Sequence, residues 1–148
     1  MLITGVVALD QALKALVIRT LPLGASIILL PVLSLTRVHN PGVAFSLLPQ
    51  VPAFVPAVIV ATLLVLLFRH EAGWAQDAQA QRALALLAGG AVGNLIDRVR
   101  FGAVIDYLDL HIWPVFNLAD IAVTIGAALL ILSLVARTQA TPQPRGDR

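Results

Sequence analysis

Residues 116–136 read FNLADIAVTIGAALLILSLVA, a mostly apolar stretch of about twenty residues. A helix of this length crosses the hydrocarbon core of a lipid bilayer. The stretch has a single charge, Asp120 near its start, and Arg137 follows directly after its end. It therefore predicts a transmembrane helix that carries one acidic residue close to a membrane face.

Apolar stretches of the same kind occur elsewhere in the 148 residues, at 2–18, 51–68 and 83–96. The composition agrees, because 59% of the residues are hydrophobic and only 12% are charged, whereas a soluble domain carries about 25% charge. The sequence therefore predicts an all-α polytopic membrane protein with four transmembrane helices. We expect a single membrane domain over residues 1–137 and a polar, disordered tail at 138–148.

The segment between the first two predicted helices, residues 21–50, has a different pattern. Its apolar part, residues 23–33, is too short to span a bilayer and is interrupted by Pro31. Residues 33–36 alternate between apolar and polar side chains, which is typical of a strand, and residues 40–42 (NPG) predict a turn. We therefore expect a small β-containing lobe at one membrane face.

The arginines give the predicted orientation in the membrane. Four crossings put both termini on one side, together with Arg69, Arg82, Arg137, Arg145 and Arg148. The other side holds Arg19, Arg37, Arg98 and Arg100. The small excess favours cytoplasmic termini, with the lobe and a loop at 97–115 facing outward.

Several classes of function are excluded by what the sequence lacks. It contains no cysteine, which excludes a thiol nucleophile, a disulfide and a cysteine-ligated metal. The net charge is +2, but the ten basic residues form no run, so no nucleic-acid partner is predicted. His70 and Glu71 begin an H-E-x-x-H zinc motif, but Trp74 stands in place of the second histidine. We expect no metal and no organic cofactor.

Charges inside predicted membrane helices are unfavourable and therefore point to structure or function. Asp10 and Lys14 are four residues apart and share a helix face, which predicts a structural ion pair, with a direct role at a site as the alternative. Asn94, Asp97 and Arg98 also share one face. They either form the interfacial end of a helix or support a neighbouring site.

Asp106 and Asp120 can each be explained singly by structure. Asn117 is the predicted N-cap of the last helix, where Asp120 at the third position is stabilised by free backbone N–H groups. Together, however, both aspartates lie toward the same membrane face, so their carboxylates can converge. Two close carboxylates share a proton, and one acts as a general base while the other acts as a general acid. This is the equipment of an aspartic protease.

Two other functions fit part of the pattern. A proton- or ion-coupled transporter would use the aspartates as a relay, but a relay would be expected to reach both membrane faces. A structural subunit of a larger complex explains the helix cap and leaves the other motifs unexplained.

The motifs together resemble those of signal peptidase II, the bacterial lipoprotein signal peptidase family. Residues 10–14 (DQALK) resemble its D-Q-x-x-K motif and residues 40–46 (NPGVAFS) its N-x-G-A-A-F-S motif. Residues 93–98 (GNLIDR), 102–107 (GAVIDY) and 116–120 (FNLAD) resemble G-N-x-x-D-R, G-x-V-x-D-F and F-N-x-A-D. The likeness runs in the same order over nearly the whole chain.

The resemblance implies an intramembrane aspartic endopeptidase of the bacterial inner membrane, with Asp106 and Asp120 as the catalytic pair. Its substrate would be a prolipoprotein bearing a diacylglyceryl group, cut just before the lipidated cysteine. The lobe at 21–50 would be an extracytoplasmic β-cradle between the first and second helices. The implied substrate-binding or supporting residues are Asn40, Asn94, Asp97, Arg98 and Asn117. We expect a monomer in contact with membrane lipids.

Overall fold

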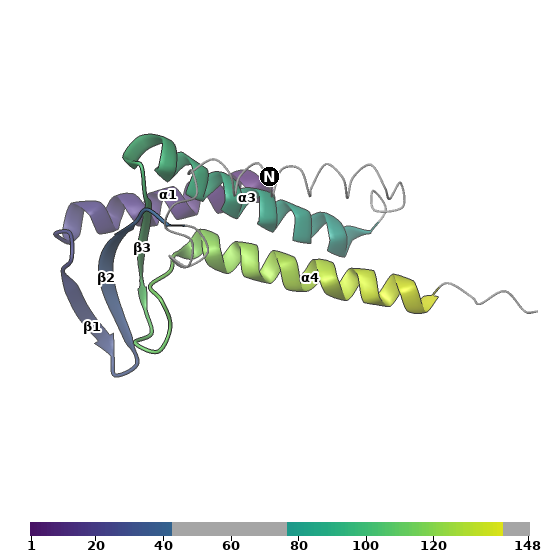
Figure 1. Ribbon diagram of the computed structural model, residues 1–148. Helices are drawn as coiled ribbons and strands as arrows, with labels where there is room; N and C mark the ends of the chain where they lie inside the picture. The colour runs from purple at the N-terminus through teal and green to yellow at the C-terminus, as the bar shows by residue number, and fades with distance from the viewer. Residues whose placement is uncertain (43–76, 141–148) are drawn as a thin grey trace, which may run out of the picture.

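The computed structural model describes residues 1–42 and 77–140 of the chain. In these ranges the helices are α1 (Leu2–Thr20), α3 (Ala78–Phe101) and α4 (Leu118–Ala140), and the strands are β1 (Ser26–Leu30), β2 (Leu33–Asn40) and β3 (Val104–Asp109). The helices lie side by side, and the strands form a sheet at one end of them (Figure 1). The end of α1, the end of α3 and the start of α4 therefore meet next to the sheet.

α3 has a defined start and a defined end. Asp77 precedes it and accepts hydrogen bonds from the backbone N–H groups of Gln79 (2.9 Å) and Ala80 (3.1 Å), which lack partners within the first helical turn. Gly102 follows it with a φ of +70°, a left-handed conformation that glycine adopts readily. α3 thus extends beyond the predicted stretch at 83–96, and its last turns reach the sheet.

The other predicted helices can be compared with the structure in the same way. The stretches at 2–18 and 116–136 correspond to α1 and α4, whereas the stretch at 51–68 lies outside the described residues. Within the described part, Leu118–Thr138 is the one helical segment long and apolar enough to cross a membrane. Membrane crossing by α1 and α3 stays a prediction. α4 continues to Ala140, so the first residues of the predicted tail are helical, and the rest of that tail lies outside the described residues.

Small residues allow α3 to approach both other helices closely. A side chain at Gly89 would meet Cβ of Val6 on α1 at 2.9 Å, and one at Gly90 would meet the backbone carbonyl of Ala119 on α4. Farther from the sheet, α3 and α4 enclose a small core made of Ala80, Ala83, Leu84 and Leu130. α3 is therefore the central helix against which the other two are positioned.

The sheet has the order β1-β2-β3 and is antiparallel throughout. The strand predicted at 33–36 is confirmed as part of β2. The loop predicted at 97–115 is wrong, because α3 runs on to Phe101 and β3 occupies Val104–Asp109. The first four residues of β3 are all buried, so the strand lacks the apolar and polar alternation that reveals a half-exposed strand. The sheet therefore combines the predicted lobe with a later segment, and the end of that lobe, residues 43–50, lies outside the described residues.

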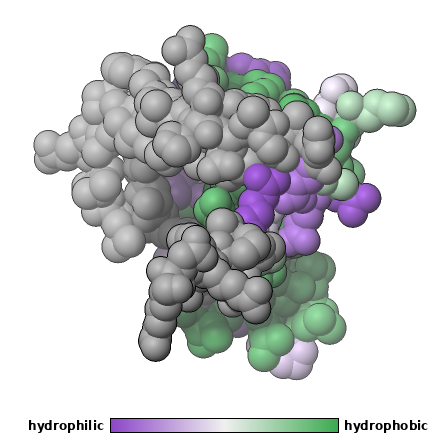
Figure 2. Space-filling model, turned by 90° about the vertical axis from the view of Figure 1, so that its right-hand side faces the viewer, coloured by the Kyte–Doolittle hydropathy of each residue, from purple (hydrophilic) through white to green (hydrophobic). Residues whose placement is uncertain are grey.

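Large apolar side chains remain exposed on α1, on α4 and on β1, for example Leu16, Ile131 and Ile28. Soluble monomers seldom expose so much apolar surface, which agrees with the membrane location predicted from the sequence. Seen from the end opposite the sheet, hydrophilic side chains gather between hydrophobic ones (Figure 2). The described residues thus expose apolar side chains on these elements and a group of hydrophilic ones on the face that Figure 2 shows.

Candidate active site

Asp106 lies in the middle of β3, opposite Val38 of β2. It is 2% exposed, and its carboxylate accepts two amide hydrogen bonds. Asn40 Nδ2 donates to Oδ2 at 2.9 Å, and Asn117 Nδ2 donates to Oδ1 at 2.7 Å. Asn40 ends β2 and Asn117 directly precedes α4, so the sheet and the helix each supply one donor.

Asp120 lies in the first turn of α4, where it forms a reciprocal cap with Asn117. Asn117 Oδ1 accepts a hydrogen bond from Asp120 N (2.9 Å), and Asp120 Oδ2 accepts one from Asn117 N (3.2 Å). The predicted N-cap is confirmed. The other carboxylate oxygen of Asp120, Oδ1, accepts a hydrogen bond from Asn94 Nδ2 of α3 at 2.9 Å. Asn117 therefore contacts both aspartates, one through its side-chain amide and one through the helix cap.

The two aspartates line one cavity of about 260 Å³, which lies between the sheet, the end of α3 and the start of α4. Three other predicted site residues line the same cavity, namely Asn40, Asn94 and Arg98. The guanidinium of Arg98 donates to the backbone carbonyl of Gly42 at 3.1 Å. The remaining two, Asp97 and Asn117, are buried behind the cavity wall.

The environment of Asp106 changes its acidity. Burial raises the pKa of Asp106 to about 7; the hydrogen bonds from Asn40 and Asn117 oppose this shift, and the negative charge of Asp120 adds to it. A carboxyl group with a pKa near neutrality both gives and takes a proton at physiological pH. The cavity thus contains a carboxyl group suited to acid–base chemistry.

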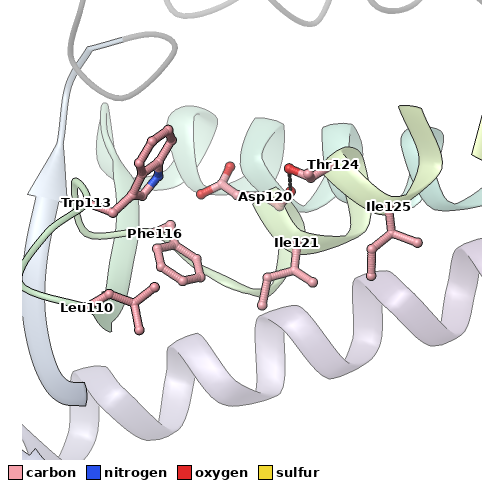
Figure 3. Close-up of a pocket in the computed structure, with 7 residues that line it drawn as sticks. All are labelled: Leu110, Trp113, Phe116, Asp120, Ile121, Thr124 and Ile125. Carbon is pink, nitrogen blue, oxygen red and sulfur yellow. Dashed lines mark hydrogen bonds between the residues drawn. The ribbon is translucent and has the colours of Figure 1, made fainter. Parts of the chain in front are cut away.

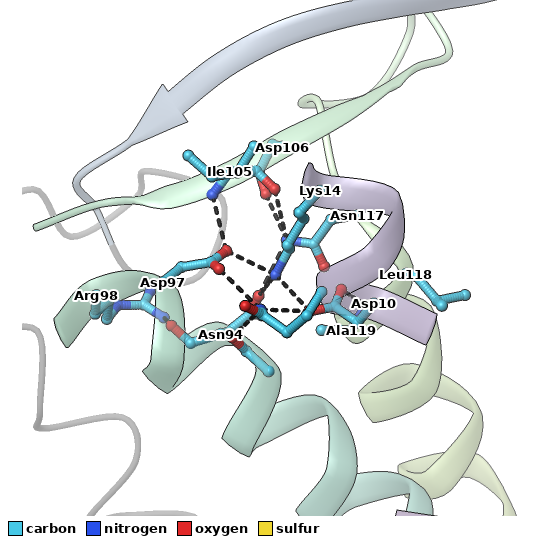
Figure 4. A network of polar contacts seen from close by, with 12 residues as sticks. Asp10, Lys14, Asn94, Asp97, Arg98, Ile105, Asp106, Asn117, Leu118 and Ala119 are labelled. Carbon is cyan, nitrogen blue, oxygen red and sulfur yellow. Dashed lines mark hydrogen bonds and ion pairs between the residues drawn. The ribbon is translucent and has the colours of Figure 1, made fainter. Parts of the chain in front are cut away.

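Behind the cavity, Lys14 is the centre of a buried polar network (Figure 4). Its Nζ atom lies 2.8 Å from Asp10 Oδ2 and 2.7 Å from Asp97 Oδ2, and it donates to Asn94 Oδ1 at 2.9 Å. The predicted pair of Asp10 and Lys14 is present, and Asp97 extends it to a group of three that joins α1 to α3. Asp10 Oδ1 also accepts a hydrogen bond from Ala119 N of α4 at 3.1 Å. The network therefore connects all three described helices.

Asp97 also connects the network to the sheet. Its Oδ2 atom accepts a hydrogen bond from Ile105 N at 3.1 Å, one residue before Asp106. Sequence reasoning missed Gln11, whose Nε2 donates to Asp97 Oδ1 at 2.9 Å; a glutamine next to Asp10 in an apolar helix was the available signal. It also missed Tyr107, whose hydroxyl accepts a hydrogen bond from Leu118 N at 3.3 Å. That contact depends on β3 lying beside α4, which no local pattern reveals.

A second cavity, of about 320 Å³, adjoins Asp120 on the other side (Figure 3). Its walls are mostly apolar and consist of Leu110, Trp113, Phe116, Ile121, Thr124 and Ile125. Asp120 and Thr124 line both cavities. One carboxylate thus stands between a polar cavity and an apolar one.

Known proteins resemble this chain in sequence. A family model described as Signal peptidase (SPase) II matches residues 2–136. The Lipoprotein signal peptidase of Halothermothrix orenii is 47% identical over 132 residues, which cover 87% of this chain and 89% of that protein. The Lipoprotein signal peptidase of Pelotomaculum thermopropionicum is 44% identical over 138 residues, covering 90% and 89% of the two chains.

Solved structures resemble it in fold. A bacterial membrane enzyme solved by the in meso method superposes with a TM-score of 0.83 at 32% identity, over 99% of this chain and 92% of that one. A second bacterial membrane enzyme superposes with a TM-score of 0.76 at 34% identity, over 90% of each chain. Given the matched length and these identities, the chain belongs to the signal peptidase II family of bacterial membrane peptidases.

Proposed function

We propose that this peptidase is an aspartic endopeptidase in which Asp106 and Asp120 activate a water molecule. One observation carries the proposal: both carboxylates line the same cavity, and each accepts a hydrogen bond from an asparagine amide. The sequence contains no cysteine, so a thiol nucleophile is excluded. The raised pKa of Asp106, about 7, supports one proton shared by the pair near neutral pH.

In the proposed mechanism, the ionised carboxylate takes a proton from the water as its oxygen bonds to the carbonyl carbon of the scissile peptide. The protonated carboxyl gives its proton to the carbonyl oxygen, which forms a tetrahedral intermediate. When the intermediate collapses, the bond between carbon and nitrogen breaks and the leaving nitrogen takes the proton that the pair holds. As the carbonyl re-forms, a hydroxyl of the intermediate gives its proton back to the other carboxylate, so the pair again holds one proton. Asn94 and Asn117 hold the carboxylates in position through the hydrogen bonds at Oδ1 of each.

The proposed substrate is a prolipoprotein whose cysteine carries a diacylglyceryl group, cut just before that cysteine. The apolar cavity beside Asp120 offers a place for an apolar part of this substrate next to the reacting bond. We further propose four membrane crossings, at α1, at residues 51–68, at α3 and at α4. The sheet and the aspartates would face the outer side of the inner membrane, with cytoplasmic termini and a monomer as the acting unit.

The proposal is tested with the purified full chain in lipid vesicles and a fluorogenic lipobox peptide, supplied with and without the diacylglyceryl group. We expect cleavage of the lipidated peptide alone. Asp106→Asn and Asp120→Asn are each expected to lower kcat by about 100-fold or more, because each removes one half of the acid–base pair. Asp77→Asn is the matched control, since it also neutralises one aspartate but at the far end of α3.

Near-normal cleavage by either Asp106→Asn or Asp120→Asn, with Asp77→Asn also active, would overturn the assignment of the pair. Equal cleavage of both peptides would remove the proposed dependence on the lipid. Far-ultraviolet circular dichroism and the melting temperature of each variant establish that the loss of activity is not a loss of folding.

A further inference from the structure

Asn94 is a hydrogen-bond donor to Asp120, and its side chain must be turned one way to donate. The amide nitrogen gives a hydrogen bond to Asp120 Oδ1 at 2.9 Å. In the reversed orientation, the amide oxygen would face the carboxylate, and two acceptors would repel each other. The orientation of this amide therefore decides whether Asp120 receives a hydrogen bond or a repulsive contact.

The side-chain oxygen of Asn94 is held by two donors. Lys14 Nζ donates to it at 2.9 Å and Asn117 Nδ2 donates to it at 3.1 Å. An ammonium group has donors only, so a neighbouring Lys14 permits only the oxygen of the amide to face it. Lys14 therefore selects the orientation of Asn94 that places the nitrogen on Asp120.

Asn117 continues the chain to the second aspartate. Its Nδ2 atom donates to Asn94 Oδ1 and, at 2.7 Å, to Asp106 Oδ1, while its Oδ1 atom accepts the hydrogen bond from Asp120 N. With Asn94 fixed, the nitrogen of Asn117 faces both Asn94 and Asp106. A continuous chain of hydrogen bonds thus runs from Lys14 to both carboxylates of the cavity. Figure 4 shows Lys14, Asn94, Asn117 and Asp106 of this chain.

The contacts of Lys14 exceed what ion pairing requires. It is 2% exposed, and its three N–H donors are matched by three acceptors: Asp10 Oδ2, Asp97 Oδ2 and Asn94 Oδ1. Two carboxylates already compensate the single positive charge. The third donor is directed at the amide that serves Asp120, and helix packing alone gives no reason for it.

We propose that Lys14 is a positioning residue of the peptidase, which orients the amides of Asn94 and Asn117 so that each donates to one of the two aspartates. This inference rests on the proposed function, because it assumes that Asp106 and Asp120 carry the reaction. Lys14 acts through these asparagines and touches neither carboxylate of the pair. Its charge also favours the ionised form of Asp106, so its removal raises the pKa of that group.

The main test compares two chains, Asp97→Asn and Asp97→Asn with Lys14→Met. The double variant removes one positive and one negative charge, so the net charge of the buried group stays that of the wild type. We expect the double variant to have a kcat about 10- to 100-fold below that of Asp97→Asn with KM little changed, because the misplaced groups act in the chemical step. We also expect the alkaline limit of its pH–rate profile to move to higher pH, since Asp106 then keeps its proton longer.

The charged groups that face this network are, by element, Asp10 on α1, Asp97 and Arg98 on α3, Asp106 on β3 and Asp120 on α4. Only residue 14 differs between the two chains of the main test, because both carry Asp97→Asn. A purely structural Lys14 would alter the melting temperature and leave kcat at neutral pH where it is, whereas the pH limit reports the charge of Lys14 on Asp106. Equal kcat and an equal pH limit in the two chains overturn the proposal.

Two further variants keep the inference testable. In an Asn94→Ala chain the hydrogen bonds that join Lys14 to Asp120 through Asn94 are already absent, so adding Lys14→Met is expected to change kcat by less than about threefold. A loss of kcat as large as in the main test would contradict the proposal.

Lys14→Arg keeps the charge and both carboxylate partners, but its planar group does not place a donor where Nζ lies. We expect it to fold and to lose about 10-fold in kcat, and wild-type kinetics would overturn the proposal even if the methionine variants fail to fold.

The wild-type chain separates this inference from the function on which it rests. If the wild type does not cut the lipidated peptide, or if Asp120→Asn cuts it normally, the proposed function has failed. If both of these behave as expected and the Lys14 variants have normal kinetics, only the positioning role has failed.

Discussion

Two clusters of charged side chains join the helices of this protein at opposite ends, and they differ mainly in burial. At the sheet end, Asp10, Lys14 and Asp97 are at most 2% exposed and are completed by asparagine and backbone donors. At the other end, Asp77 precedes α3 and pairs with Arg137 of α4 at 3.2 Å, with side chains that are 23% and 31% exposed. Carboxylates paired with a basic side chain therefore occur both in a buried cluster and in a solvent-exposed one.

The difference shows why the proposed function lies at the sheet end. Buried charges are costly unless every donor and acceptor is matched, so they persist only where the surrounding structure is fully determined. Exposed charges interact weakly with each other and tolerate replacement. A site that must hold two carboxylates in a fixed relation is therefore expected next to the buried cluster.

The largest expected difference between the two ends is in how their aspartates respond to pH. Burial raises the pKa of Asp106 to about 7 from 3.8, so the native state holds a proton that the unfolded state has lost between these values. The free energy of unfolding therefore falls as pH rises from about 4 to 7, by about 4 kcal/mol, and does not recover above 7.

The pKa of Asp77 is shifted in the opposite direction. The hydrogen bond from Ser133, followed by that from Ala80 N, lowers its pKa to about 2, so its contribution is present above pH 4 and is lost between about 4 and 2.

The measurement is the unfolding free energy in mixed micelles from pH 3 to 9 for the wild type, Asp106→Asn and Asp77→Asn. Subtracting each variant from the wild type gives the contribution of the replaced aspartate, which for Asp106 includes its interaction with Asp120. We expect the Asp106 difference to change between pH 4 and 7 and the Asp77 difference to change only below pH 4. A flat Asp106 difference, or two differences with the same sign of slope, would show that the two ends are not distinguished by burial.

The next effect concerns loss of one carboxylate from each cluster. Asp10→Ala removes a partner of Lys14 and leaves the backbone N–H of Ala119 without its acceptor in a buried position. We expect the unfolding free energy to fall by about 3 kcal/mol. The matched change, Asp77→Ala, removes a helix cap and an exposed pair, and its effect on the melting temperature is expected to be clearly smaller. Equal shifts in the two melting temperatures would contradict the comparison.

Features that depend on neighbouring residues were open to prediction from the sequence. The start of α4 is one: Asn117 and Asp120 are three residues apart, and the hydrogen bonds of the cap are made between them. The apolar length of α4 and the alternation at residues 33–36 are others. In each case the information lies within one or two turns of chain, where the physics of capping and periodicity acts.

Features that depend on contacts between residues far apart in the chain could not be predicted from the sequence. β3 is buried along its first four residues because β2 covers its edge and the helices lie behind it, and its own sequence carries no alternation. The third partner of Lys14, Asn94, is 80 positions away in the chain. The sequence placed Lys14 in a pair with Asp10 because only the local partner is visible there. The hydrogen bonds that connect this pair to Asp106 and Asp120 form only because α1 packs against α3 in the folded chain.

The smallest expected effect is that of Arg137→Gln at the exposed end. Its guanidinium approaches Asp77 Oδ2 through Nε at 3.3 Å and through the terminal nitrogen at 3.2 Å, both in reach of water. Such a pair contributes little, and salt screens what remains, because the Debye length shrinks to about 3 Å at 1 M ionic strength. We therefore expect the melting temperature to shift by no more than about 3 °C in low salt and by less in 1 M NaCl. Lys14→Met, with its buried partners, should show a large shift that salt does not reduce. If salt weakened both effects alike, the network at the sheet end would have to be accessible to water, and burial would no longer explain why the two clusters differ.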